Sequence, residues 1–375
     1  MKDVLDALEK VFGDVQNGII TAAEKLPAPE VTPLTRRSAS QTVAAVAVDA
    51  GQSLFKGVLR EAGITLIRVS SSWRDETPLT VPFWFNPFLD DDARRQQIES
   101  QIDTIVQQPS FISESLTSLI SHMGWQTQLP SQAYNTAENA LNFVRDLLEW
   151  ATLAHVAQRL RDQLQTHPDA TQGLVLRDGA LRFAHFSESA SQRLSDLFQG
   201  IGVPILGFVK RSPLLRHPLL HYWLLLHRAE TLDRPEPFVV WIGDDLFAQA
   251  GYRLERYFGQ QGQQGKQVRW GRYALVRLDA QPGSRHFFLV DIPLYLYPNR
   301  EQVVVLLSNL IIQRGATAFP WPGYPVPLAE AHRKVRLDDQ TARLFESVLR
   351  TRLDQDAATL WRIFLALMSY PERQE

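Results

Sequence analysis

The sequence predicts an α/β or α+β fold in which one sheet is covered by helices. Short apolar runs such as 44–48, 203–209 and 238–242 have the length and the β-branched content of buried strands. Longer stretches with an apolar residue at every third or fourth position, such as 135–166, are typical of helices. The two kinds of segment alternate along most of the chain, and this alternation indicates a single sheet with helical cover.

The first ninety residues are predicted to contain a helix, a linker and two strands. Apolar residues recur at helical spacing within 2–26, and the three prolines of the segment PAPEVTPL end this helix. The run AAVAVDAG, which contains Asp49, and the segment 63–72 are the two strands. The stretch 73–87 is rich in proline and aromatic residues, and it is interpreted as a long surface excursion.

The remainder of the chain supplies most of the predicted helices and strands. The pair Asp178-Gly179 lies between two apolar runs, a pattern that predicts a β-hairpin. The glycine- and glutamine-rich segment 258–267 is predicted to be a loop. Helices are expected over 91–125, 135–166, 189–202, 299–315 and from Asp338 onward, and strands over 203–210, 238–243, 272–280 and 286–297.

Composition excludes several classes of protein. The chain has 375 residues, of which 45% are hydrophobic and 21% are charged, so a wholly disordered or fibrous protein is excluded. At about 150 residues per domain, this length corresponds to two or three domains or to one elaborated domain. A net charge of −2 argues against nucleic-acid binding through bulk charge alone, although a local basic groove is compatible with it. The absence of cysteine excludes disulfides, thiolate metal sites and cysteine nucleophiles.

Membrane and targeting signals are not found in the sequence. The most apolar stretch, Val303 to Ile312, is too short for a membrane span, which needs ~20 apolar residues. The N-terminal segment carries acidic residues throughout and lacks the apolar region of a signal peptide. We therefore expect a cytoplasmic protein without a membrane segment.

Common catalytic motifs are also missing. Gly265-Lys266 is followed by Gln267, whereas a Walker A loop requires Ser or Thr at this position. There is no G-x-S-x-G elbow and no H-E-x-x-H pair. His217 and His221 are four residues apart, but without a third ligand at a known spacing they are interpreted as a polar helix edge.

Three acidic residues could carry metal chemistry. Asp49 and Asp178 each end an apolar strand, where a carboxylate is held rigidly and can bind Mg²⁺ or Mn²⁺. The alternative for each is ordinary turn chemistry, since Asp is common before Gly. Glu149 lies in the predicted helix 135–166, and its alternative is a surface ion pair with Arg145.

The segment 319–337 combines prolines, a basic cluster and two further candidates. Tyr324 and His332 are separated by eight positions. The densest basic cluster of the chain follows and could bind phosphate groups, although a solvated charged face is the alternative. It consists of Arg333, Lys334 and Arg336.

Five ordered blocks together resemble the NurA nuclease family. They are VAAVAVDAGQS, RDLLEWATLA, LVLRDGAL, GVPILGFVKRSP and YPVPLAEAHRKVRL, and they span about residues 40 to 340. The resemblance implies a ribonuclease-H-like mixed sheet flanked by helices, with helical insertions and an N-terminal helix. It implies a nuclease domain over 36–375, with a helical insertion at about 90–135, preceded by a helix and linker over 1–35.

The family's activity is implied by the same resemblance. The chain is expected to cleave DNA with Mn²⁺, or with Mg²⁺, at a two-metal site, as a 5′-to-3′ exonuclease and single-strand endonuclease. Such enzymes process DNA ends as homodimers together with a hexameric ATPase of the HerA type, in repair or in defence against foreign DNA. Carried over residue by residue, Asp49, Glu149, Asp178 and His332 would be metal ligands, Tyr324 would complete the catalytic site, and Lys210 would lie near the scissile phosphate, with Arg333, Lys334 and Arg336 as further phosphate contacts.

Two departures from the family pattern leave other hypotheses open. Ala50 separates Asp49 from Gly51, and Ala180 stands where the family usually has Ser. A catalytically inactive scaffold or clamp for the ATPase is therefore the principal alternative. An unrelated α/β hydrolase or binding protein is a third hypothesis. The N-terminal helix could pack on the core or dock on the ATPase, and the aromatic stretch 73–88 could stack on DNA bases or bridge a dimer.

Overall fold

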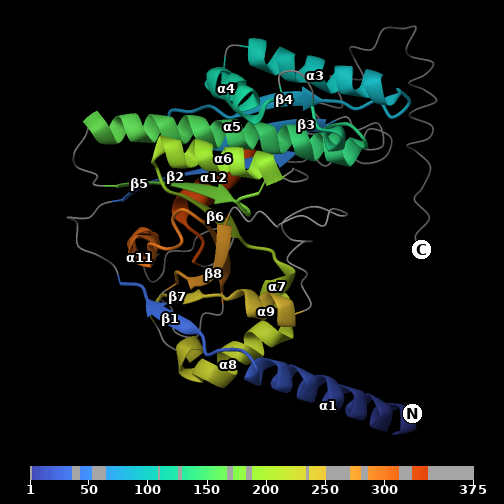
Figure 1. Ribbon diagram of the computed structural model, residues 1–375, viewed down its shortest axis with the longest axis vertical. Coiled ribbons are helices and arrows are strands. Elements are labelled where there is room, and N and C mark those ends of the chain that lie inside the picture. Colours follow the sequence, from blue (N-terminus) through green and yellow to red (C-terminus); the bar gives the residue numbers. More distant parts are fainter. Residues whose placement is uncertain are drawn as a thin grey trace. The chain divides into compact units, whose positions relative to one another are not determined.

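The computed structural model contains a mixed nine-stranded sheet with helices around it (Figure 1), as the sequence predicts. The strands follow one another in the order β1-β7-β8-β9-β6-β5-β2-β3-β4. No described helix is both long and apolar enough to cross a membrane. The structure describes residues 2–35, 43–52, 65–108, 110–125, 129–166, 172–182, 188–233, 236–250, 271–279, 286–311 and 323–336.

The chain divides into two compact units. Three elements continue from one unit into the other: β2 (Val43–Gln52), α5 (Ala137–Thr166) and α12 (Val326–Val335). The first unit comprises Met1–Val46, Ala157–Arg182 and Phe186–Ala329, and the second comprises Ala47–Val156, Phe183–His185 and Glu330–Glu375.

In the described part of the chain, six strands belong to the first unit. Only β5 and β6 among them are described as parallel neighbours, and the remaining described pairs in this unit are antiparallel. The segment predicted to be a linker contains the edge strand β1, because its residues pair with β7. The strands are β1 (Glu30–Pro33), β5 (Gln172–Asp178), β6 (Ile205–Val209), β7 (Phe238–Trp241), β8 (Gly271–Arg277) and β9 (Phe288–Pro293).

The predicted hairpin at Asp178-Gly179 is wrong. Residues 179–182 are not a strand, and β5 instead pairs in parallel with β6. Parallel neighbours need a crossover rather than a two-residue turn, and the helix α6 (Glu188–Ile201) lies between the two strands in the chain. This helix and all four later strands coincide with predicted segments.

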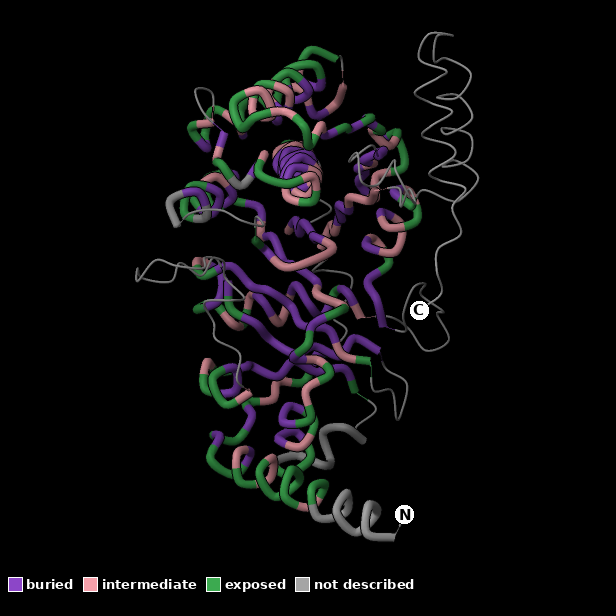
Figure 2. The backbone as a smooth tube through the Cα atoms, turned by 90° about the vertical axis from the view of Figure 1, so that its right-hand side faces the viewer, coloured by how far each residue is buried: buried purple, intermediate pink, exposed green. Residues whose placement is uncertain are grey.

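The predicted N-terminal helix, α1 (Lys2–Glu24), is confirmed. Its C-terminal end joins the core of the first unit, where Ala23 packs in one cluster with Trp223 of α8 (Pro218–Asp233). Over residues 11–18 the helix is largely exposed (Figure 2), and Phe12 is 69% exposed. Three further helices of this unit are α7 (Pro213–Arg216), α9 (Asp244–Gln249) and α11 (Arg300–Ser308).

The second unit holds most of an antiparallel three-stranded part of the sheet and a set of helices. β2 pairs with β3 (Thr65–Ser71), which pairs with β4 (Leu79–Phe83). Two helices fall in the range predicted to be a helical insertion, α3 (Asp91–Gln107) and α4 (Ser113–Met123), and are followed by a short 3₁₀ turn at Ser131–Ala133.

The interpretation of 73–87 as a surface excursion is wrong for its second half. Val81, Phe83 and Phe85 are buried, and the first two alternate with exposed residues in β4. Pro82 is tolerated because β4 is the last strand of the sheet, where a missing backbone N–H interrupts no ladder. The predicted loop 258–267 and the predicted helix after Asp338 lie outside the described residues.

Candidate metal centre

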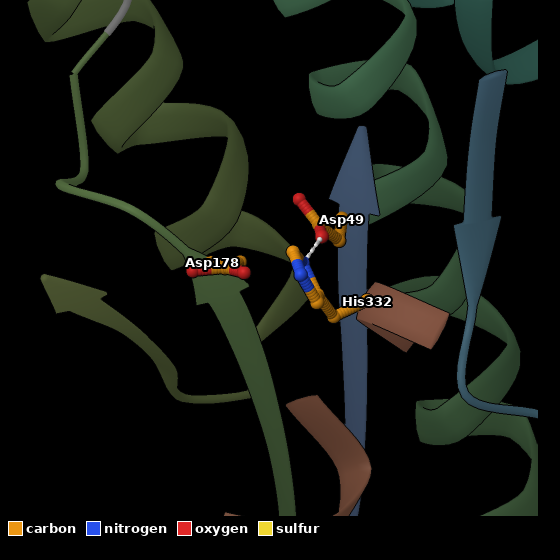
Figure 3. Close-up of side chains that lie close together, drawn as sticks. All are labelled: Asp49, Asp178 and His332. Carbon is orange, nitrogen blue, oxygen red and sulfur yellow. Dashed lines mark hydrogen bonds and ion pairs between the residues drawn. The ribbon is translucent and has the colours of Figure 1, made fainter. Parts of the chain in front are cut away.

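A carboxylate and an imidazole from distant parts of the sequence meet within the second unit. Asp49 follows a run of fully buried residues in β2 and is itself buried. His332 reaches it from α12, and the Nδ1 atom of His332 lies 2.8 Å from the Oδ2 atom of Asp49 (Figure 3). A carboxylate that accepts from Nδ1–H fixes the tautomer in which Nε2 carries a lone pair, the form in which histidine binds a metal ion.

The backbone around Asp49 fixes its other oxygen. The Oδ1 atom of Asp49 accepts a hydrogen bond from the backbone N–H of Ala50 at 2.8 Å. In the sheet, Asp49 pairs with Ser70 of β3. Alanine at position 50, where the family pattern has glycine, therefore retains this hydrogen bond to the Asp49 carboxylate, because the bond does not depend on the side chain at position 50.

α12 lies close against β2 at Gly51. Leu328, Ala331 and Val335 are the buried face of this helix, at the spacing of an amphipathic helix. A Cβ atom on Gly51 would lie only 2.8 Å from the carbonyl oxygen of Val335. Glycine is thus required here because any side chain would displace the helix that carries His332.

A second carboxylate, Asp178, lies in the first unit at the end of β5 (Figure 3). The ammonium group of Lys210, which directly follows β6, donates a hydrogen bond to its Oδ2 atom. Parallel pairing of β5 with β6 brings these two strand ends together. The same ammonium lies 4.8 Å from the centre of the Tyr324 ring. Tyr324 is fully buried, and its ring packs against the ammonium of Lys210.

The turn after Asp178 is held by a residue that sequence reasoning missed. Asp291 of β9 is buried, and its Oδ2 atom accepts from the backbone N–H of Leu181 at 2.8 Å. Burial raises the pKa of Asp291 to about 7, because little solvent is available to stabilise the charged form. A Cβ atom on Gly207 would lie 2.5 Å from the carbonyl oxygen of Gly179, so this turn also packs flush on β6. The signal in the sequence was an acid inside an otherwise apolar strand, FFLVDIP.

Glu149 is buried on α5, with 4% of its surface exposed. The proposed surface pair with Arg145 is not what the structure describes, since Arg145 donates to Asp146 at 3.1 Å. Within the second unit, Asp49 and His332 are the pair that offers a carboxylate and an imidazole to a metal ion. The roles of Asp178, in the first unit, and of Glu149 as ligands stay predictions.

The basic cluster separates into two kinds of residue. Arg333 and Arg336 are exposed. Lys334 is half-buried, and its ammonium donates to the backbone carbonyls of Ser71 at 3.1 Å, Glu76 at 3.3 Å and Trp73. Burial lowers the pKa of Lys334, while the nearby Glu76 carboxylate raises it. Its donors are therefore committed to the protein itself, which the sequence could not indicate.

The two histidines four residues apart have ordinary structural partners. The Nδ1 atom of His217 accepts from the backbone N–H of Leu219 at 3.2 Å, and the Nε2 atom of His221 lies 2.9 Å from the carbonyl oxygen of Leu215. Burial lowers the pKa of His217. These contacts agree with the interpretation of the pair as a polar helix edge.

The fold and these side chains define a mixed α/β protein with a candidate centre for a divalent metal ion. No protein-family model matches the chain, and no curated protein is significantly similar to it. Solved structures similar to it include a crystal structure of NurA with manganese, at 11% identity and a TM-score of 0.35 over 94% of this chain and 99% of that chain. A crystal structure of NurA matches at 12% identity and a TM-score of 0.35 over 96% and 97% of the two chains. A crystal structure of NurA bound to dAMP and manganese matches at 13% identity and a TM-score of 0.33, again over 96% and 97%.

Proposed function

We propose that this chain is a manganese-dependent DNA nuclease of the NurA type. The observation that carries the proposal is the contact between Asp49 and His332, two residues that the five-block sequence resemblance had selected as metal ligands. They lie 283 positions apart in the sequence, and β2 and α12 nevertheless bring their side chains to 2.8 Å. We propose that Asp178, whose carboxylate lies at the end of β5, joins them in one metal centre.

The chemistry of the donors suits manganese. Two carboxylates and one imidazole offer two kinds of ligand atom, oxygen and nitrogen. Mg²⁺, Ca²⁺ and Mn²⁺ all take carboxylate oxygens, and the two carboxylates therefore suit Mn²⁺. Mn²⁺, the ion that the family resemblance implies, is the proposed ion, with Mg²⁺ as the ion to compare.

A bound metal ion would supply Lewis acidity and an activated water for phosphodiester hydrolysis. The protein's own groups would do the rest. Asp49 and Asp178 would hold the centre, and His332 would be oriented by Asp49. Lys210 would neutralise charge on a DNA phosphate next to Asp178. The ring of Tyr324, against which the Lys210 ammonium packs, would hold this ammonium in place. Exposed Arg333 and Arg336 would contact flanking phosphates.

Digestion of end-labelled DNA with Mn²⁺ tests this proposal. Asp49→Ala and Asp178→Ala should each reduce cleavage by about three orders of magnitude, since a lost metal centre removes several kcal/mol of transition-state stabilisation. Binding of DNA without metal should persist in both variants. Asp162→Ala is the matched control, because this acid lies on α5 with an exposed side chain. Undiminished cleavage by the double variant Asp49→Ala/Asp178→Ala would rule out the assignment.

The finer parts of the proposal follow the family resemblance. We propose 5′-to-3′ exonuclease and single-strand endonuclease activity, a homodimer, and a HerA-type hexameric ATPase as partner. The ATPase would supply the motor, because the sequence of this chain shows no Walker A loop. We also propose that 36–375 is the nuclease domain, with 1–35 appended to it. Substrates labelled at the 5′ or the 3′ end report polarity, and light scattering with and without the cognate ATPase reports assembly.

The inactive scaffold is the second candidate. It is favoured only by the Ala50 and Ala180 departures, and the backbone hydrogen bond from Ala50 to Asp49 weakens the first of them. The two candidates differ in metal binding. A scaffold would bind no Mn²⁺ through Asp49, whereas the nuclease should bind it in calorimetry and lose that binding in Asp49→Ala.

A further inference from the structure

Lys334 lies two residues beyond His332 on α12 and is enclosed by a cradle of backbone carbonyls. Its ammonium donates to Ser71 at 3.1 Å, to Glu76 at 3.3 Å and to Trp73. All three carbonyls belong to the end of β3 and the connection that follows it. An ammonium group has three N–H donors, and this cradle presents three acceptors to it.

The cradle is itself rigidly built. The hydroxyl of Ser71 donates to the Oε2 atom of Glu76 and accepts from the backbone N–H of Trp73 at 3.2 Å. The other carboxylate oxygen of Glu76 lies 3.4 Å from the Nε2 atom of His155 on α5. Glu76 is buried, so its negative charge acts on the nearby ammonium of Lys334 with little screening by water. Contacts that do not involve Lys334 therefore also hold the connection that carries these carbonyls.

These contacts close a ring that contains the candidate metal ligands of the second unit. Asp49 pairs with Ser70 across the sheet, and Ser71 follows in the chain. The carbonyl of Ser71 binds Lys334, and one half-turn of α12 leads back to His332, whose Nδ1 atom meets Asp49 at 2.8 Å. Lys334 thus ties α12 to the end of β3, beside the strand that carries Asp49.

We infer that Lys334 is a positioning residue, which holds α12 so that His332 meets Asp49, and not a contact for DNA phosphate. The inference deepens the proposed function, because it concerns how the proposed metal centre is assembled. Arg333 next to it is exposed and carries the same charge. The two neighbours are predicted to have different tasks, Lys334 toward the protein and Arg333 toward the nucleic acid.

The first test uses the metal-free protein, so it does not depend on whether the chain is a nuclease. In wild type, the ¹⁵N chemical shifts of the His332 ring should show Nδ1 donating to a carboxylate. Lys334→Met keeps the length of the side chain and removes its donors, and it should shift these signals toward those of a free imidazole. Arg333→Met is the matched control and should leave them unchanged. Unchanged ring signals in a folded Lys334→Met protein would overturn the inference.

The second test compares metal and DNA affinities. Lys334→Met should weaken Mn²⁺ binding by about tenfold, the lower end of what loss of an outer partner costs a metal site. Its DNA affinity without metal, and the dependence of that affinity on salt, should match wild type. Arg333→Met should do the reverse and reduce the salt slope by about one. A Lys334→Met protein with a reduced salt slope and normal Mn²⁺ affinity would show that Lys334 binds phosphate instead.

A charge-preserving variant covers the case in which Lys334→Met does not fold. Lys334→Arg retains the positive charge, and a planar guanidinium binds phosphate at least as well as an ammonium does. Its flat fork cannot aim three donors at the same three carbonyls. The inference therefore predicts altered His332 ring signals with unchanged DNA affinity, and normal ring signals would overturn it. In a further outcome, neither wild type nor any variant binds Mn²⁺, while the His332 ring signals still change in Lys334→Met and not in Arg333→Met. That outcome would refute the proposed metal centre and support the positioning role.

Discussion

Gly51→Ala adds one methyl group at the place where α12 approaches β2. In most strand positions this change would stabilise the protein by about 0.4–1 kcal/mol through the unfolded state. Here the new Cβ atom would lie 2.8 Å from the carbonyl oxygen of Val335, and ordinary contact begins at 3.4 Å. The helix must therefore retreat by about 0.6 Å, which is 3.4 − 2.8. Because the obstacle is backbone, no side-chain rotation can relieve it.

The retreat has a cost in stability and a consequence for the metal centre. Overpacking of this kind typically costs about 1–3 kcal/mol, so the free energy of unfolding should fall by about that amount after the small gain is offset. His332 lies one turn before Val335 and moves with it. Adding 0.6 Å to its 2.8 Å contact with Asp49 takes the separation beyond the range of a good hydrogen bond.

Urea unfolding and Mn²⁺ calorimetry on the same preparation measure both effects. Gly18→Ala is the control, because Gly18 lies in α1 with nothing near its missing Cβ, so alanine should be neutral or stabilising there. If Gly51→Ala is as stable as wild type and binds Mn²⁺ equally well, then α12 does not rest on β2 as described, and the reasoning about His332 is refuted.

Two further changes test the carboxylates. Asp291 is protonated in the folded protein up to a pH of about 7 but ionises above about 4 in the unfolded chain, so this residue's contribution to the free energy of unfolding is present below pH 4 and is lost as pH rises toward 7. Asp291→Asn should remove that loss. In urea titrations, the free energy of unfolding of the variant minus that of wild type should therefore be larger at pH 8 than at pH 5; an equal difference at the two pH values would contradict the raised pKa. The family resemblance implies a two-metal site with Glu149 as a further ligand. On that hypothesis, Glu149→Gln should lower the Mn²⁺ stoichiometry from two ions per chain to one, while Glu138→Gln, at an exposed position of the same helix, should not; an unchanged stoichiometry would show that Glu149 is not a ligand.

Local sequence patterns were sufficient for most helices and strands, and they failed where tertiary context outweighs them. The Asp178-Gly179 pair has hairpin chemistry, but the backbone after it is fixed by Asp291 and by its packing on Gly207, and β5 pairs in parallel with β6. β4 was missed because Pro82 suggested a loop, whereas an edge strand accepts proline. Local sequence patterns predict neither the strand order nor the hydrogen bond from Lys210 to Asp178.

The candidate site was accessible from sequence only through the resemblance. Spacing alone could not have brought Asp49 and His332 together, because it says nothing about contacts 283 residues apart. Charge counting could not distinguish Lys334 from Arg333, since a sequence shows a cation but not the carbonyls that surround it. Nor does a sequence show that Tyr324 is completely buried with its ring against Lys210.

The distance in sequence between Asp49 and His332 also affects when the protein acquires its proposed activity. A ribosome must translate 283 further residues after Asp49 before His332 exists, and loop closure over that length is slow. A nascent or truncated chain that has not reached α12 contains β2 and Asp49 without their imidazole partner. The proposed nuclease activity would therefore appear only after α12 has been synthesised, because the proposed metal centre needs His332.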